Sequence, residues 1–390
     1  MSYTVAVDRS AVFGLLDRIL PLWQKKAFPY DQKQAIIPQT LIPEGIAGNK
    51  RLLANFYFYC CIYMRGGIES IQAFRQLISL WEDYPYLFDP KQAQLEKPKR
   101  LQTILRSYIG WDSKNAAKFW IENSQRLCEH WDGCADNLIP GMHDYAEATR
   151  RIKNKTTLKE KRAAGPDGLG FIGFQPKMVS MLVYFFDWHG LLEKRFPFPA
   201  PADFHNFRLG LAHRGLLILP IEEIYIRVNE KLSKAWRDVL MEYIIERNAD
   251  PVEVADAIWM FSLVLCGNSP VNQFSIQKEE GDSDKQQEDL QLNLFKKEDI
   301  PPKKGRGYLA GLSDGVRRTC LVCPIRSTCM LAIPATHYYS NKHDVTGRKM
   351  GGRMLLQPHP LGDMSRQGVT VEKLSASVQA ELTETAVFDL

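Results

Sequence analysis

One lysine and one aspartate stand at the expected starts of two successive helices. Lys177 follows Pro176, which suits the first helical position because its φ is already helical and its missing N–H would have no partner there. The helix dipole and burial both favour a neutral amine at this end, and a neutral lysine can attack a sugar C1′ to form a Schiff base. The alternative is a solvated lysine or a phosphate contact, which is the commoner role for this residue type.

Asp203 precedes a helical pattern of apolar residues at Phe204, Phe207 and Leu211. Aspartate is a leading N-cap residue, so a purely structural role is the simplest interpretation. The two roles are compatible, because a capping carboxylate is ionised and fixed in place. Such a group could stabilise an oxocarbenium-like centre or steer a nucleophile.

Two segments together resemble a known family. The segment 171–177 reads Phe-Ile-Gly-Phe-Gln-Pro-Lys, and the segment 203–208 reads Asp-Phe-His-Asn-Phe-Arg. This pattern is similar to that of the helix-hairpin-helix DNA glycosylases of the endonuclease III superfamily. The resemblance implies double-stranded DNA as the partner and an all-α, two-lobed fold of that family, with an iron–sulfur cluster loop. The polar composition of residues 271–306 adds a disordered insertion to this expectation.

The resemblance also implies roles for individual residues. Gly173 matches the first glycine of a hairpin that binds a DNA phosphate through backbone N–H groups, and Gln175 replaces its second glycine. Lys177 matches the Schiff-base nucleophile of the bifunctional members, and Asp203 matches the aspartate common to the catalytic members. The interval between Lys177 and Asp203 looks longer than in endonuclease III.

Three cysteines form a C-x2-C-x5-C motif, and their spacing alone leaves zinc and an iron–sulfur cluster open. The motif consists of Cys320, Cys323 and Cys329. In the family this spacing ends a four-cysteine [4Fe–4S] site, which implies Cys266, at the end of an apolar helix, as the remaining ligand. The other cysteines are expected to be buried small hydrophobes: Cys60, Cys61, Cys128 and Cys134.

A basic segment precedes the hairpin. Residues 151–170 are expected to form a loop that carries Lys159, Lys161 and Arg162. Such a run is usually a solvated loop. Because this one leads directly into the hairpin, contact with DNA phosphates is the alternative.

Composition sets outer limits on the protein class. The chain has 390 residues, of which 45% are hydrophobic, so it can build a sizeable core. A net charge of +5 does not by itself establish a nucleic-acid partner. We expect no signal peptide and no membrane span, because charged residues interrupt the apolar stretches. The expected location is cytoplasmic and nucleoid-associated, with the protein a monomer.

Hydrophobic periodicity predicts a chain of helices and almost no strand. Residues 82–96 are expected to be loop-like. Beyond the apolar helix that begins at Pro176, the expected helices are 10–24, 50–64, 68–81, 97–108, 114–131, 221–246 and 251–265. The expected organisation is an N-terminal helix in 1–50 packing on the cluster lobe, a helical barrel with the hairpin in 51–203, the cluster lobe in 204–345 and a loosely ordered tail in 346–390.

A polar linker is expected at 271–306, within the cluster lobe. Inside it stand Gln291, Leu292, Leu294 and Phe295, in a pentapeptide similar to the one by which bacterial replication and repair proteins bind the sliding clamp. The apolar pair would fill a pocket of the clamp and the glutamine would make a polar contact. The alternative is a short local turn or strand, or packing on the cluster lobe.

The function expected from these observations is DNA repair. The chain would flip a modified base out of the duplex and cleave its N-glycosidic bond, with AP lyase activity through Lys177. One alternative is a monofunctional glycosylase in which Asp203 activates water. Another is a non-catalytic DNA-binding protein that keeps the fold.

Overall fold

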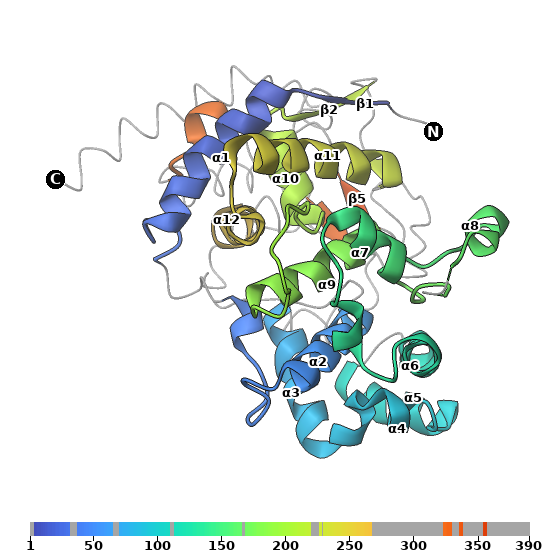
Figure 1. Ribbon diagram of the computed structural model, residues 1–390. Coiled ribbons are helices and arrows are strands. Elements are labelled where there is room, and N and C mark those ends of the chain that lie inside the picture. Colours follow the sequence, from blue (N-terminus) through green and yellow to red (C-terminus); the bar gives the residue numbers. More distant parts are fainter. Residues whose placement is uncertain are drawn as a thin grey trace, which may run out of the picture. The chain divides into compact units, whose positions relative to one another are not determined.

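The computed structural model describes residues 4–31, 37–64, 70–109, 113–165, 168–219, 226–227, 229–266, 323–329, 335–337 and 354–356 (Figure 1). The chain divides into two compact units. The first unit comprises Met1–Ala35, Ala202–Val239 and Ala257–Leu390, and the second comprises Ile36–Pro201 and Leu240–Asp256. Lys177 therefore belongs to the second unit and Asp203 to the first.

The described residues are mostly helical, which agrees with the expected all-α class. The α-helices are α1 (Arg9–Gln24), α2 (Lys50–Tyr63), α3 (Ser70–Asp83), α4 (Pro90–Ala93), α5 (Pro98–Ile109), α6 (Ser113–His130), α7 (Tyr145–Ile152), α8 (Leu158–Arg162), α9 (Pro176–Trp188), α10 (Phe204–Ala212), α11 (Glu230–Arg247) and α12 (Pro251–Phe261). Short 3₁₀ helices cover Pro38–Thr40, Pro85–Phe88, Ala135–Leu138 and Arg326–Thr328, and a π-helical turn covers Ser262–Cys266.

Among its described residues the first unit contains five short strands, where almost none was expected. They are β1 (Thr4–Val7), β2 (Leu216–Leu219), β3 (Ile226–Arg227), β4 (Ala335–His337) and β5 (Met354–Leu356). β1 pairs antiparallel with β2, and β5 pairs antiparallel with both β3 and β4. The pairings of β1 with β2 and of β3 with β5 join segments far apart in the sequence, so local periodicity could not have predicted them.

Helix α2 forms the centre of the second unit. Every residue from Leu53 to Tyr63 is buried, as expected for a helix that is apolar on all sides. Tyr59 stacks on Trp120 of α6 with ring centroids 4.4 Å apart, and Phe58 stacks on Phe174 at 5.2 Å. The aromatic core of this unit thus reaches the turn that precedes α9.

The first unit is built on α1, the β1–β2 pair and α10. Asp8 caps α1 by accepting a hydrogen bond from Ala11 N–H, and the face that includes Val12 and Leu16 is buried. At Gly215, just before β2, a Cβ atom would lie 2.5 Å from Val12 Cγ2. Only glycine therefore lets β2 approach α1 this closely.

Most of the expected helices are confirmed within about two residues of their predicted ends. Three expectations about where helices lie were wrong. Residues 82–96 contain the Pro85–Phe88 turn and α4, the expected loop 151–170 contains α8, and the helix expected from residue 221 begins only at Glu230, after β3. Asp89 and Thr157 supply the caps that start the two short helices. A span this short shows little hydrophobic periodicity, which is why the pattern missed both.

No described helix combines the length and the apolar character that a membrane crossing requires.

Candidate active site

A tight turn at Phe171–Gln175 leads into α9. Phe174 N–H donates to Phe171 O at 3.0 Å, and Gln175 N–H donates to Gly173 O at 3.1 Å. Gly173 has a φ of +88°, in the left-handed region that glycine adopts without steric cost. The N-cap of α9 is Gln175, which is exposed and makes no capping hydrogen bond with its side chain.

The side chain of Asn123, in the middle of α6, holds this turn. Its Nδ2 donates to Ile172 O at 2.9 Å, and its Oδ1 accepts from Ile172 N–H at 2.7 Å. Asn123 is fully buried. Sequence reasoning missed this residue; the available signal was an asparagine inside a helix, where it is a poor helix former.

Replacing Asn123 by alanine should lower the free energy of unfolding by about 2 kcal/mol, because the N–H and C=O of Ile172 both lose their partner. Urea unfolding of the purified protein measures the change. The matched control is Asn137→Ala, which removes an exposed hydrogen bond to Trp131 O and should cost far less. Equal shifts for the two variants would contradict this role of Asn123.

The same turn lies against the end of α7. Phe171 N–H donates to Ile152 O at 3.1 Å, and Asn154 N–H donates to Phe174 O at 2.9 Å. At Gly170 a Cβ atom would lie 2.0 Å from Lys153 O, so this close approach requires glycine. α7, the turn and α9 thus form one helix–turn–helix arrangement. Residues 153–170, which include α8, leave this arrangement after α7 and return to it before the turn, and we call this segment the excursion.

Lys177 is the second residue of α9 and is half-buried. Within the described part of the chain, its ammonium group has no hydrogen-bond or ion-pair partner. Two other helices of the described part of the chain also begin with Pro-Lys. In α4, Lys91 forms an ion pair with Asp132 at 2.9 Å, whereas in α5 Lys99 occupies the same second position as Lys177. The Pro-Lys start is therefore a common local pattern here, and it cannot by itself identify a nucleophile.

Asp203 is the N-cap of α10, as expected. Its Oδ1 accepts from Asn206 N–H at 3.1 Å and from Asn206 Nδ2 at 3.0 Å. Asn206 is buried, and its Oδ1 accepts from Trp236 Nε1 at 2.9 Å. Asp203 is half-buried. Its carboxylate is held by Asn206, which is itself held by Trp236 of α11.

The next residues of α10 connect it to the end of α12. His205 and Arg208 are both buried. His205 Nδ1 lies 3.1 Å from Ser262 Oγ, and Arg208 Nη1 donates to the same oxygen at 3.4 Å. Ser262 opens the π-helical turn that ends at Cys266. The helix that begins with Asp203 is thus hydrogen-bonded to the turn that carries one of the predicted cluster ligands.

The segment from Cys323 to Cys329 docks through the residues between these two half-buried cysteines. Ile325 is buried, and Thr328 Oγ1 donates to its carbonyl at 3.2 Å. Thr328 Oγ1 also accepts from Arg18 Nη1 at 3.1 Å and lies 3.0 Å from His213 Nδ1. Burial and the neighbouring Arg18 lower the pKa of His213 to about 4, so this imidazole is neutral near pH 7.

The predicted ligand set is described only in part. Cys320 and the side chain of Cys266 lie outside the described residues. No group of three or more metal-ligating side chains occurs among the described ones. The other four cysteines were expected to be buried small hydrophobes. This is confirmed for Cys60, Cys61 and Cys134, while Cys128 is half-buried.

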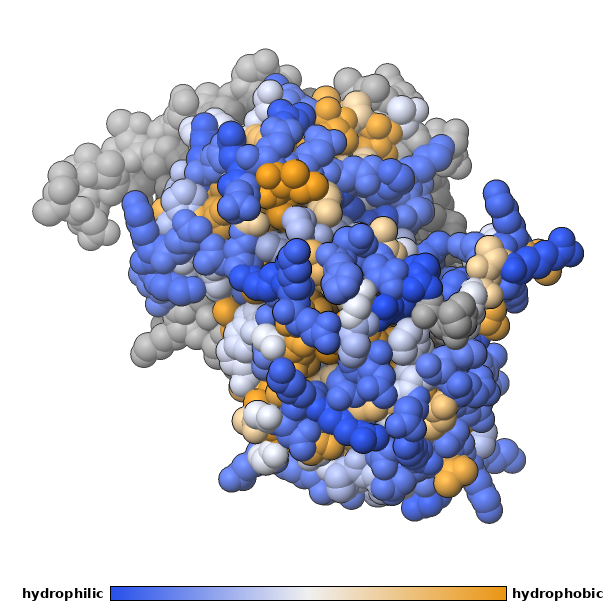
Figure 2. Space-filling view, in the orientation of Figure 1, coloured by the Kyte–Doolittle hydropathy of each residue, from blue (hydrophilic) through white to orange (hydrophobic). Residues whose placement is uncertain are grey.

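The basic segment is ordered around α8, where Lys159, Lys161 and Arg162 are all exposed. Figure 2 shows a mostly hydrophilic projection at the place that α8 occupies in Figure 1. An ion pair with Lys153 and the capping hydrogen bonds lower the pKa of the Glu160 carboxyl to about 2. The acidic side chain of α8 is thus engaged by Lys153 and by the start of the helix.

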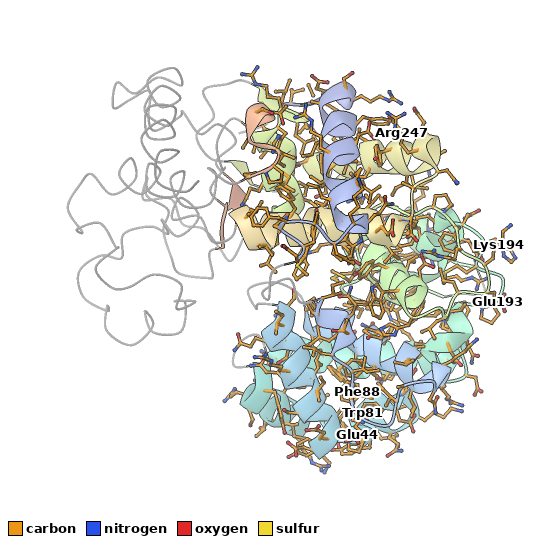
Figure 3. All side chains as sticks on the ribbon, turned by 90° about the vertical axis from the view of Figure 1, so that its left-hand side faces the viewer. Glu44, Trp81, Phe88, Glu193, Lys194 and Arg247 are labelled. Carbon is orange, nitrogen blue, oxygen red and sulfur yellow. The ribbon has the colours of Figure 1, made fainter. Side chains whose placement is uncertain are left out.

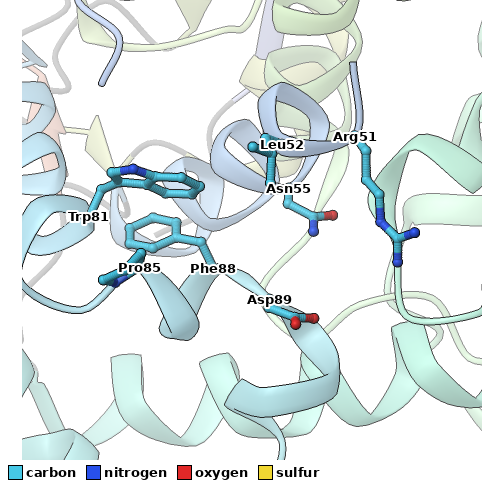
Figure 4. A pocket seen from close by; sticks show the side chains of 7 residues that line it. All are labelled: Arg51, Leu52, Asn55, Trp81, Pro85, Phe88 and Asp89. Atoms are coloured by element: carbon cyan, nitrogen blue, oxygen red, sulfur yellow. The ribbon is translucent and has the colours of Figure 1, made fainter. Parts of the chain in front are cut away.

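A pocket of about 160 Å³ opens in the second unit (Figure 4) and is lined by Arg51, Leu52, Asn55, Trp81, Pro85, Phe88 and Asp89. Trp81 and Phe88, also labelled in Figure 3, have ring centroids 5.0 Å apart. The Asp89 carboxylate accepts from Lys91 N–H and from Gln92 Nε2, both at 3.0 Å. This carboxylate serves the start of α4. None of the predicted site residues lines the pocket, and we do not assign it a function.

The predicted clamp-binding residues Gln291, Leu292, Leu294 and Phe295 lie outside the described residues. Neither a protein-family model nor a curated protein matches the chain.

Proposed function

We propose that the protein is a DNA N-glycosylase with AP lyase activity. The proposal rests on the position and surroundings of Lys177. This lysine is the second residue of α9, which follows the glycine turn, and its amine has no hydrogen-bond or ion-pair partner among the described residues. The turn is held from two sides, by Asn123 and by the end of α7. A nucleophile needs this combination of a fixed backbone and an unengaged amine.

The chemistry assigns each residue one step. The neutral Nζ of Lys177 attacks C1′ of the flipped nucleotide as the bond from C1′ to the base breaks. The carboxylate of Asp203 stabilises the positive charge that develops at the sugar. The attached amine passes a proton to the departing base, and the sugar ring then opens with protonation of O4′ by water to give a Schiff base. Loss of a proton from C2′ of this Schiff base allows β-elimination of the 3′ phosphate. Fixation of Asp203 by Asn206 and Trp236 supports its role, because a preorganised carboxylate does not have to reorient during the reaction.

Binding would use the turn and α8. The backbone N–H of Gly173 and the exposed side chain of Gln175 would approach a phosphate, and Lys159, Lys161 and Arg162 would neutralise others. The exposure of these three cations supports this. Docking of the segment Gln291–Phe295 on a sliding clamp is a separate part of the proposal.

Cys266, Cys320, Cys323 and Cys329 would hold a [4Fe–4S] cluster. Four thiolates are the usual ligands of such a cluster. The donor type fits, and so does the packing, since the segment that carries two of the ligands is anchored through Ile325 and Thr328. When bound, the cluster would fix the loop rather than take part in bond cleavage.

Protein purified without oxygen should be yellow-brown, absorb broadly near about 400 nm and contain about four irons per chain. Cys323→Ser should remove most of the iron, because one of four ligands is lost. Cys128→Ser is the control, since Cys128 is half-buried elsewhere, and it should keep its iron. Stoichiometric zinc without iron in the wild-type protein would overturn the assignment.

The activity itself is tested with duplexes that each carry one modified base. We expect release of the base from at least one duplex, and a covalent protein–DNA adduct when borohydride is present to reduce the Schiff base. Duplex binding without base release on any of them would favour the non-catalytic alternative. Base release without a trapped adduct would favour the monofunctional one.

A further inference from the structure

α8 is a fixed and exposed helix. Thr157 and Glu160 form a reciprocal capping box, and Lys153 Nζ pairs with Glu160 Oε1 at 2.7 Å. The base of the excursion is tied as well, because Lys155 Nζ donates to Gly168 O at 2.6 Å and to Arg150 O at 3.0 Å. No residue of α8 is buried. The ion pair and the capping box hold this helix in place without any apolar packing of its own.

One face of α8 combines an apolar side chain with two cations. Leu158 is 73% exposed. Lys161 and Arg162 follow it at i+3 and i+4, so all three lie on the same side of the helix. The Leu158 side chain contributes nothing to a core and lies between two cations on a helix that a capping box holds. Such a face is suited to contact with an anionic partner that also offers apolar surface.

We propose that Leu158 enters a groove of duplex DNA while Lys161 and Arg162 contact phosphates on either side of it. This inference rests on the proposed function. The charge of the face selects a polyanion, and sugar and base edges supply the apolar surface between its phosphates. α8 also lies on the excursion whose base is hydrogen-bonded to the turn before α9. An anionic membrane is a less suitable occupant, because one leucine offers little apolar area for insertion.

Two substitutions at position 158 separate apolar contact from charge. Leu158→Ala should weaken binding to a short duplex about tenfold, because the burial of one leucine side chain no longer contributes to the affinity. The dependence of the affinity on salt concentration (the salt slope) should not change. Leu158→Lys should weaken binding too, although it adds a cation. A purely electrostatic face requires the reverse, with tighter binding and a steeper slope. Lys161→Ala with Arg162→Ala should flatten the slope by about two phosphates.

The matched control is Leu95→Ala, because Leu95 is 79% exposed between α4 and α5 and should bind DNA like wild type. Binding by Leu158→Lys that equals or exceeds that of wild type would overturn the inference. So would a Leu158→Ala variant that loses binding to phosphatidylserine vesicles but keeps its affinity for duplex. These results differ from failure of the proposed function, in which the wild-type protein would release no base from any duplex.

Discussion

Lys177→Ala should yield no borohydride-trapped adduct on a duplex that the wild-type protein cleaves. The variant removes the amine that forms the Schiff base, and no other group is proposed for that bond. Base release should fall by about 100-fold or more, which corresponds to about 2.7 kcal/mol in barrier height. Denaturing gels measure the adduct, and single-turnover kinetics measure base release. The Lys177 side chain has no hydrogen-bond or ion-pair partner within the described residues, so the stability of the variant should change little.

Lys99→Ala is the matched control for this variant. Lys99 follows Pro98 as the second residue of α5, just as Lys177 follows Pro176 in α9. It therefore reproduces the helix start, the charge and the dipole without the glycine turn. Adduct yield should equal that of wild type. If Lys177→Ala still releases base at the wild-type rate, the amine is not the nucleophile, and water directed by Asp203 takes that role.

Asp203→Asn should slow base release by roughly 100- to 1,000-fold, the usual cost of removing one electrostatic stabiliser of a transition state. Asparagine is as good an N-cap as aspartate, so the variant removes the charge and keeps the cap of α10. The unfolding midpoint should therefore stay close to that of wild type, while the single-turnover rate of base release falls by the factor given above. A rate that falls only in proportion to lost stability would reduce Asp203 to a structural cap.

Asp8→Asn provides the corresponding control in the same unit. Asp8 caps α1 through Ala11 N–H at 3.0 Å, much as Asp203 caps α10 through Asn206 N–H at 3.1 Å. The substitution makes the same change of charge at a helix start that has no proposed chemistry. Base release should be unchanged. A comparable loss of activity would show that the effect at Asp203 comes from the cap.

The helices could be predicted because their signals are local. The apolar face of α1 repeats with the helical period, and α9 begins at a proline and continues through buried apolar residues to Trp188. Asp203 was predicted as an N-cap from its type and its position before α10. These features depend on neighbours within one or two turns, which the sequence displays directly.

The remaining features depend on partners that are distant in the sequence. Asn123 holds Ile172 across 49 positions, and β1 pairs with β2 across most of the chain. No period in the sequence records either contact. Trp236 and its hydrogen bond to Asn206 belong to the same class. The sequence indicated the cap at Asp203, and only the fold shows what holds the capped helix start in place.

The excursion of residues 153–170 begins and ends at one place. Ile152 accepts from Phe171 N–H, and Asn154 N–H donates to Phe174 O, so its two ends are already joined by hydrogen bonds. Loop-closure entropy changes slowly with length, so a segment with fixed ends can lengthen or shorten without disturbing its anchor. The segment between these hydrogen bonds can thus be replaced as a unit. Its sequence can diverge, or another binding element can be inserted in its place by design, while the turn before Lys177 keeps its geometry.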